Sequence, residues 1–278
     1  MKSQNKFKSI YCFTGKGGVG KSVIALALAH CLATQAQGRK VHFFSWEANS
    51  SAEKLLRPLG INDGTIVDDS RSVIEYLQRK LGKIVGNWIG NTSFFSSVMQ
   101  VVPSIRYMLS LEEMIKSLTD SSDKVIGVFD APSSGHMLVM FKSFESYIQI
   151  LKKGVVFEDI LHAQSLLRDP QFCKINLITL PSVFACNEAL ETQENLVSMG
   201  WKKKAIEIYL NQSFLSLKEN IPSTQMPSFF SKKIFLEEKI LSDFGPTIQG
   251  IFPYTAHQDL SELVQELSGM SNLMKLLI

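Results

Sequence analysis

The sequence is poor in cysteine and has no long run of like charges. Its 278 residues contain four cysteines, at positions 12, 31, 173 and 186, and no Cys-x-x-Cys pair. These spacings argue against a disulfide framework and a zinc site, and they favour a reduced, cytoplasmic protein. The 29 Lys and Arg residues against 26 Asp and Glu give a net charge of +3 without a basic run, which argues against nucleic acid as a partner.

A membrane-spanning segment is also lacking. The longest charge-free stretch, 84–105, contains two Gly, two Asn, a Gln, a Pro and several Ser and Thr, a composition too polar for a membrane helix. Near the N-terminus, three lysines precede the apolar run 10–13, but a Gly-Lys-Gly-Gly sequence ends that run too early for a signal peptide. We therefore expect no targeting segment and no integral membrane segment.

What the sequence does contain predicts a folded α/β protein, since 45% of its residues are hydrophobic and 20% are charged. Short apolar runs without polar alternation predict parallel strands covered on both faces. These runs are 10–14, 41–45, 125–129, 175–180, 206–210 and 251–252. Helical patterns lie between them at 23–35, 187–199 and 230–244. The order predicts a doubly wound, mostly parallel sheet.

Two stretches, 64–122 and 141–169, interrupt this alternation. Each contains successive helical patterns and no clear strand. We expect them to form a helical lobe inserted over the carboxyl edge of the sheet. The whole chain, 1–278, is then a single domain.

A glycine-rich motif follows the first predicted strand and precedes an alanine-rich helix. From Gly15 to Ser22 it fits the pattern G-x-x-x-x-G-K-[ST], in which backbone N–H groups surround phosphate oxygens and the helix N-terminus adds positive charge. Lys21 is expected to neutralise the β- and γ-phosphates and the Ser22 hydroxyl to bind Mg²⁺. The predicted ATP-binding residues of this P-loop are Gly15, Lys16, Gly17, Gly18, Val19, Gly20, Lys21, Ser22 and Val23.

The additional lysine, Lys16, gives this motif its deviant form. With it, the chain resembles the class of P-loop ATPases that includes the ParA and MinD partition ATPases, the nitrogenase iron protein, and the arsenite-pump and tail-anchored-protein-targeting ATPases. In that class the corresponding lysine reaches across a dimer interface to the nucleotide of the partner. The resemblance thus implies a homodimer, or a heterodimer with a paralogous ATPase, and a catalytic role for Lys16.

A second segment, 123–138, narrows the resemblance. Its predicted strand leads into Asp130, and a strand ending in an acidic residue suits a P-loop enzyme that holds Mg²⁺ directly or through water. The following Ala-Pro-Ser-Ser-Gly-His resembles the switch II signature of the arsenite-pump ATPase (ArsA) and guided-entry branch. By that resemblance, His136 links the nucleotide state to the helical lobe.

Two later positions match the same branch. The strand 206–210 leads into Asn211 and Gln212, where the family recognises adenine, and an amide offers the donor and acceptor that adenine requires. Pro253 matches a family proline beside the base. The resemblance implies that Asn211 and Pro253 contact adenine, although either residue alone is equally typical of a turn.

Switch I is where the chain departs from the family. The family reads Asp-Pro-Ala after the second strand, whereas this chain reads Ser45-Trp46-Glu47-Ala48. Glu47 keeps the charge but is one methylene longer, and displacing a catalytic group by about 1 Å can cost on the order of 100-fold. We expect Glu47 to be the residue that positions the attacking water, with slow or absent turnover. The zinc-binding Cys-x-x-Cys of some relatives and the metalloid-binding cysteines of others are missing, so neither function is carried over.

Methionines are frequent in and beside the predicted lobe, at positions 99, 108, 114, 137 and 140. Flexible apolar side chains suit a groove for varied hydrophobic clients, and they equally suit an ordinary core. At the C-terminus, apolar residues recur at helical spacing over 260–277, with Glu262 and Glu266 between them. This acidic face argues against a membrane anchor and favours a helix that closes over the sheet.

The sequence thus predicts a cytoplasmic, dimeric switch ATPase that binds ATP and Mg²⁺ and hydrolyses ATP to ADP and phosphate. The expected catalytic residues are Lys16, Lys21, Glu47 and Asp130, and Ser22 and Asp130 are the expected metal ligands. The client is an unidentified protein or anion. Two alternatives remain open: a non-hydrolysing regulatory subunit that pairs with an active paralogue, and a MinD-like ATPase of membrane surfaces.

Overall fold

The computed structural model describes residues 9–35, 40–46, 51–61, 63–67, 70–82, 103–120, 125–151, 153, 155–221, 226–257, 259–270 and 273. Within these residues the strands form one parallel sheet with the order β3-β2-β4-β1-β5-β6-β7. The strands are β1 (Ile10–Gly15), β2 (Lys40–Ser45), β3 (Asp63–Ile66), β4 (Val125–Asp130), β5 (Cys173–Thr179), β6 (Ile206–Ser213) and β7 (Ile248–Pro253). The predicted parallel, doubly wound α/β fold is confirmed.

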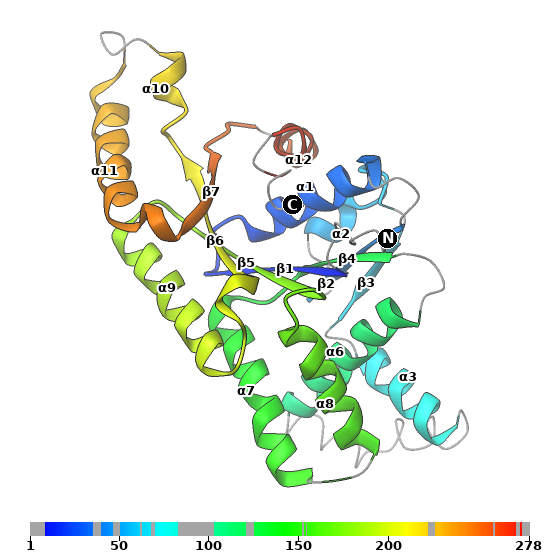
Figure 1. Ribbon diagram of the computed structural model, residues 1–278. Helices are drawn as coiled ribbons and strands as arrows, with labels where there is room; N and C mark the ends of the chain where they lie inside the picture. The colour runs from blue at the N-terminus through cyan, green and yellow to red at the C-terminus, as the bar shows by residue number, and fades with distance from the viewer. Residues whose placement is uncertain are drawn as a thin grey trace, which may run out of the picture.

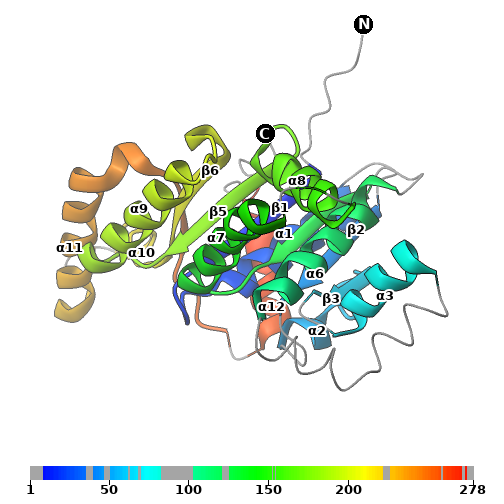
Figure 2. The same ribbon diagram turned by 90° about the horizontal axis from the view of Figure 1, so that it is seen from below.

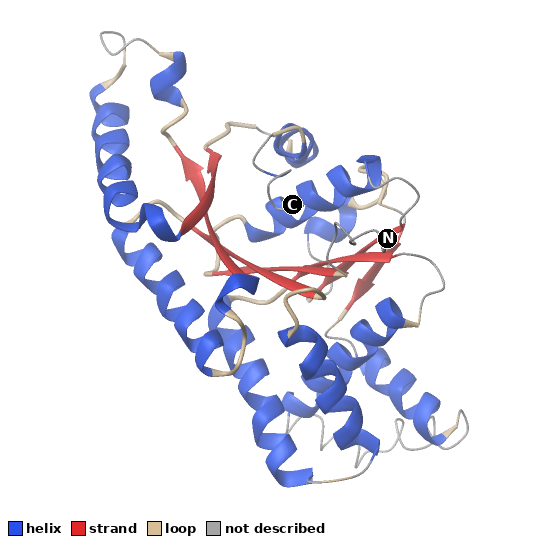
Figure 3. Ribbon diagram, viewed as in Figure 1, coloured by secondary structure: helices blue, strands red, loops and turns tan. Residues whose placement is uncertain are grey.

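Helices cover both faces of the sheet (Figure 1). The upper face in that view carries α1 (Lys21–Gln35), α2 (Ser51–Leu55) and α12 (Leu260–Ser268). The lower face carries α6 (Pro103–Thr119), α7 (Ser134–Leu151), α8 (Val155–Arg168) and α9 (Val183–Ser198), and α3 (Ser70–Leu81) packs against α6. Figure 2 shows α6, α7 and α8 lying across the strands from below, and Figure 3 shows helices on either side of the sheet.

The central strands contribute to two hydrophobic cores, one on each face. On β1, Ile10 and Cys12 join the core beneath α7, whereas Tyr11 and Phe13 join the core beneath α1. Successive side chains of a strand point to opposite faces, so a strand buried on both faces must be apolar at every position. This explains why the sequence shows continuous apolar runs instead of alternation.

The edges of the sheet are less regular. Strand β3 was not predicted, and it places 64–66 in the sheet, within a stretch expected to be helical. Its sequence, Asp-Gly-Thr-Ile, has few residues that favour strands, and most of it is exposed. At the other edge, the helices α10 (Leu217–Asn220) and α11 (Ser228–Phe244) and the 3₁₀ turns Lys203–Ala205 and Gly245–Thr247 connect and flank β6 and β7.

Four of the five methionines that could form either a client groove or a core are core residues. Met108, Met114, Met137 and Met140 are each no more than 3% exposed and belong to the core beneath the sheet. Met99 lies outside the described residues. Of the helical pattern predicted over 260–277, residues 260–268 form α12, which ends before Gly269 and packs on α1 through Val264 and Leu267. Residues 271–272 and 274–278 lie outside the described residues.

The four cysteines are buried thiols. Burial raises the pKa of the Cys173 thiol to about 12.

Among the described helices, none is both long enough and apolar enough to cross a bilayer.

Charged side chains join α3 to α6 and α8. Arg79 Nη2 lies 2.9 Å from Glu113 Oε1 and also pairs with Glu112. The Tyr76 hydroxyl donates to Asp159 Oδ2 at 3.0 Å, and Lys80 pairs with the same carboxylate. Such partly buried pairs hold the helices in one arrangement, but the carboxylates carry a desolvation cost.

Glu113 makes the stability of these helices depend on pH. Burial raises the pKa of Glu113 to about 7 against the opposing effect of Arg79. A raised carboxyl pKa means that the folded state binds the proton more tightly, so the unfolding free energy falls as pH rises from about 4.5 to about 7. Glu113→Gln should remove this pH-dependent loss of stability, because glutamine does not ionise. Arg79 would still pair with Glu112.

We therefore expect Glu113→Gln to stabilise the protein by on the order of 2 kcal/mol at pH 8 and by little at pH 5. Thermal unfolding of both proteins across this range measures the difference. A difference in melting temperature that stays constant with pH would contradict the raised pKa.

Candidate nucleotide site

The predicted P-loop, from Gly15 to Ser22, lies at the carboxyl edge of the sheet, between β1 and α1. Gly15 ends β1, and a Cβ there would lie 2.1 Å from the carbonyl oxygen of Ile178 on β5. Gly20 has φ 87°, and its Cβ would lie 2.4 Å from Asn211 Nδ2. These two positions therefore require glycine. Helix α1 begins at Lys21, so its first N–H groups face the loop and can receive an anion.

Asn211 is hydrogen-bonded to this loop. Its side chain is 7% exposed, and its Nδ2 donates to the Val19 carbonyl oxygen at 2.8 Å. Val19 itself is buried, which anchors the middle of the loop in the core beneath α1. The structure thus places Asn211 directly against the P-loop, and its contact with adenine stays a prediction.

Lys21 and Asp130, which are distant in sequence, form an ion pair. Lys21 Nζ lies 3.1 Å from Asp130 Oδ1, and the two side chains are 21% and 5% exposed. The strand register explains the meeting, since Phe13 on β1 pairs with Asp130 on β4. Two further hydrogen bonds join the same ends: Ala131 N donates to the Phe13 carbonyl at 2.9 Å, and Thr14 Oγ1 donates to the Pro132 carbonyl at 2.7 Å.

The position of Asp130 beside Lys21 suits a metal site. A buried carboxylate with a lysine beside it can exchange that partner for a divalent cation, because carboxylate and hydroxyl oxygens are ligands that Mg²⁺ prefers. Ser22 lies in the first turn of α1, next to Lys21 in the chain, so its hydroxyl and the Asp130 carboxylate are the described groups suited to the metal. The donor set fits Mg²⁺.

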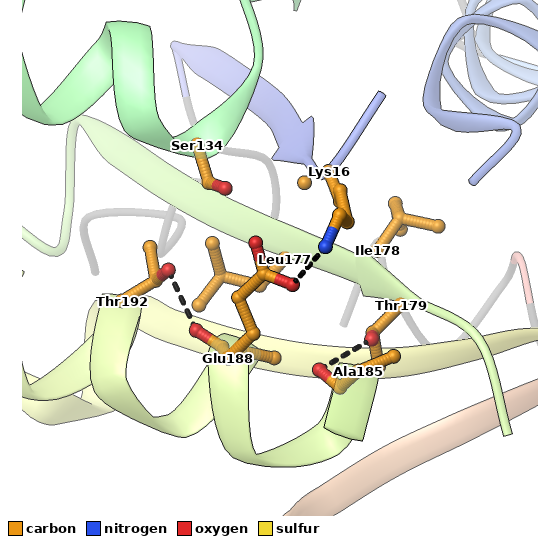
Figure 4. A pocket seen from close by; sticks show the side chains of 10 residues that line it. Lys16, Ser134, Leu177, Ile178, Thr179, Ala185, Glu188 and Thr192 are labelled. Atoms are coloured by element: carbon orange, nitrogen blue, oxygen red, sulfur yellow. Dashed lines mark hydrogen bonds and ion pairs between the residues drawn. The ribbon is translucent and has the colours of Figure 1, made fainter. Parts of the chain in front are cut away.

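Lys16 extends toward α9. Its Nζ lies 2.9 Å from Glu188 Oε2 (Figure 4). The same atom lies 4.6 Å from the centroid of the Phe184 ring. Lys16 and Glu188, together with Ser134 and Thr179, border a small pocket beside the loop. Lys16 is 52% exposed, and such a surface pair contributes about 0–1 kcal/mol. Lys16 is therefore held only weakly within its own chain.

Sequence reasoning missed Glu188 and Phe184. Neither residue belongs to the P-loop or to the switch II segment, and both lie on the first turns of α9. The sequence signal that could have identified them is their position shortly after β5, which ends at the carboxyl edge of the sheet.

The ends of β6 and β7 form the other side of the site. Gln212 has φ 59°, a strained value for a non-glycine residue, at an irregularity in the pairing of β6 with β7. Ser213, two residues after Asn211, pairs with Pro253, so both predicted base contacts lie at the ends of neighbouring strands. Strained backbone of this kind often marks binding sites.

Glu237 of α11 fixes the turn after β6. Its Oε2 accepts from Ser213 Oγ at 2.7 Å and from Phe214 N at 2.9 Å. The residue is 1% exposed, and burial raises the pKa of its carboxyl group. Glu237 was not identified from the sequence, because a single glutamate in an amphipathic helix carries no signal.

Two predicted residues of the switches have different outcomes. Glu47 lies outside the described residues. His136 lies in the first turn of α7, and its ring contacts those of Trp46 and Tyr107. The glycine-rich loop, Asp130, Asn211 and Pro253 thus lie at the carboxyl ends of neighbouring strands, at one edge of the sheet.

Comparison with known proteins gives a consistent set of relatives. No protein-family model matches the chain. It is similar to ATPase BagA of Mycobacterium tuberculosis and to the Mycobacterium bovis protein named "Putative ATPase Mb3704". Each is 30% identical over 217 residues, which cover 68% of this chain and 61% of the relative. The chain thus spans about three fifths of the length of these relatives. Both relatives are named as ATPases.

Proposed function

We propose that the protein is a cytoplasmic, dimeric switch ATPase of the ArsA-like class, which binds Mg-ATP and hydrolyses it to ADP and phosphate. The observation that carries this proposal is the P-loop between β1 and α1 with Asp130 beside Lys21. The similarity to proteins named as ATPases supports it.

Nucleotide binding follows from the groups at the P-loop. The N–H groups of the loop and of the first turn of α1 would surround the phosphates, and Lys21 would leave Asp130 to neutralise them. Ser22 and Asp130 would hold Mg²⁺, which neutralises charge on the phosphates when bound. Asn211 and Pro253 would contact the base.

Hydrolysis needs an in-line water and charge neutralisation on the opposite side of the γ-phosphate. Glu47 is the proposed water-positioning residue. Lys16 would act on the nucleotide of a second subunit, so it must first leave Glu188. Phe184, which is 71% exposed, contacts Lys16, and its neighbour Val183 is 55% exposed; these apolar side chains support a subunit contact at this face.

The second subunit is either another copy of this chain or a paralogous ATPase. Closure of the dimer on ATP would change the helices beneath the sheet, and those helices would act on a protein or anion client. The altered switch I favours one alternative, a regulatory subunit that binds ATP without hydrolysing it and pairs with an active paralogue.

Lys21→Ala tests the nucleotide site. We expect it to weaken Mg-ATP binding and to lower turnover by at least about 100-fold, because the phosphates lose their principal cation. Calorimetric titration and phosphate release measure the two effects, and circular dichroism confirms folding. Unchanged binding and turnover would refute the site. A wild-type protein that binds ATP but is as inactive as the variant would favour the regulatory subunit.

Lys16→Ala tests action across the dimer, with Glu188→Gln as the matched control. Lys16→Ala should bind Mg-ATP as the unmutated protein does yet lose about 100-fold or more in turnover. Glu188→Gln removes the same ion pair and leaves Lys16 available, so its turnover should be equal or higher. Equal losses in both variants would assign the effect to the ion pair and not to Lys16. Light scattering with and without Mg-ATP reports the dimer.

A further inference from the structure

Helix α11 has apolar side chains on two faces, and the described fold covers only one of them. The inner face carries Ile240, which packs with Leu210 of β6 and Cys186 of α9. The outer face carries three large apolar side chains that are exposed. These are Phe229, Phe235 and Leu236, which are 62%, 67% and 56% exposed. A surface helix normally has a polar outer face, so the outer face of α11 is unusually apolar.

Two lysines lie among these exposed apolar side chains. Residues three or four positions apart are neighbours on the surface of a helix. By this spacing, the outer face of α11 carries one row in which apolar and basic side chains alternate. The row consists of Phe229, Lys232, Leu236 and Lys239, with Phe235 beside the two lysines. We call these five residues the α11 stripe.

The charge of the α11 stripe is positive. Lys232 and Lys239 are exposed, and neither forms an ion pair with a carboxylate of the described residues. Of the acidic residues on the helix, Glu238 pairs with a lysine of α10, and Glu237 is buried on the inner face. Asp243 lies one turn beyond Lys239, at the end of the helix. The outward surface between Phe229 and Lys239 therefore favours an anionic partner.

Aromatic side chains continue the apolar surface beyond the N-terminal end of α11. The ring of Phe229 contacts that of Phe230, with centroids 5.4 Å apart, and the ring of Phe230 contacts that of Phe214 at 5.5 Å. Phe214 in turn stacks on Tyr254, with centroids 4.7 Å apart, and Tyr254 is 44% exposed. Tyrosine combines an apolar ring with a polar hydroxyl group, and it is enriched at the interface between membrane and water.

The position of α11 makes the stripe accessible to a flat surface. Figures 1 and 2 both show α11 at an outer end of the molecule, with the other described elements on one side of it. Because the side chains of the stripe radiate from a single helix, this surface is convex and does not form a groove for a peptide. A lipid surface fits it, since apolar side chains can enter the headgroup region while lysine side chains extend to the phosphates.

We propose that the α11 stripe binds the surface of an anionic phospholipid membrane. Phe229, Phe235 and Leu236 enter the headgroup region, and Lys232 and Lys239 lie against the lipid phosphates. Three apolar side chains and two lysines give weak, reversible binding. The inference goes beyond the proposed function, because it places the protein at a membrane surface and requires no nucleotide.

Flotation of the full chain with lipid vesicles tests this proposal. The vesicles contain phosphatidylcholine alone or phosphatidylcholine mixed with phosphatidylglycerol, and nucleotide is left out. We expect binding to the anionic vesicles only, and weaker binding at high salt, because salt screens the attraction between lysine and phosphate. Binding to both kinds of vesicle with equal affinity would overturn the role of charge.

Two sets of variants locate the binding surface. Lys232→Gln combined with Lys239→Gln should weaken binding by about 25-fold, since each lysine near an anionic surface contributes about fivefold. Phe235→Ser should weaken it by at least about tenfold, because an apolar side chain no longer leaves water. Circular dichroism confirms that the variants fold.

Matched controls carry the same changes outside α11. Lys202→Gln combined with Lys204→Gln removes the same charge from exposed lysines that precede β6, and Leu161→Ser replaces a partly exposed apolar residue of α8. Both controls should bind the anionic vesicles as the unmutated protein does. Equal losses in the controls would assign binding to general charge or apolarity and would overturn the stripe.

The remaining outcomes are also decisive. No binding of the unmutated protein to anionic vesicles would overturn the proposal. If light scattering then showed self-association that Phe235→Ser abolishes, the stripe would be a contact between two copies of the chain. Full binding by Phe235→Ser would overturn the entry of apolar side chains into the membrane. Because no nucleotide is present, each of these results leaves the proposed function to its own test.

Discussion

The ion pair between Lys21 and Asp130 depends on the parallel register of β1 and β4, and the rest of the candidate site is arranged around it. Parallel strands end at the same edge, so the loop after β1 and the acidic end of β4 meet there. Asp130 is almost fully buried, and without Lys21 or a cation its charge would be costly. The pair therefore compensates the charge of Asp130 in this structure, and under the proposed function it is the contact that a nucleotide would replace.

Glycines and a strained backbone conformation are found at the carboxyl edge of the sheet. Gly15 and Gly20 permit close approach to Ile178 and Asn211, and Gln212 adopts a left-handed conformation at a register shift between β6 and β7. Glu237 holds the following turn through Ser213 and Phe214. The strain lies where several strand ends converge, which is where doubly wound folds bind ligands.

Much of the fold and part of the site could be predicted from the sequence. The P-loop motif combines residue type, spacing and context, and the apolar runs identify strands buried on both faces. Strand β3 was missed because Asp63 and Gly64 at an exposed edge carry no strand signal. Glu188 and Trp46 were not singled out as contact residues, since their partners Lys16 and Tyr107 are distant in the chain and only the packed structure brings them together.

The central claim is that Lys21 exchanges Asp130 for nucleotide phosphates. A crystal structure of the protein with Mg²⁺ and a non-hydrolysable ATP analogue tests it most directly. The account predicts phosphates surrounded by the P-loop, with Lys21 Nζ on a phosphate oxygen and Asp130 on the side of the metal. A nucleotide bound elsewhere, or bound at the loop with Lys21 still paired to Asp130, would contradict it.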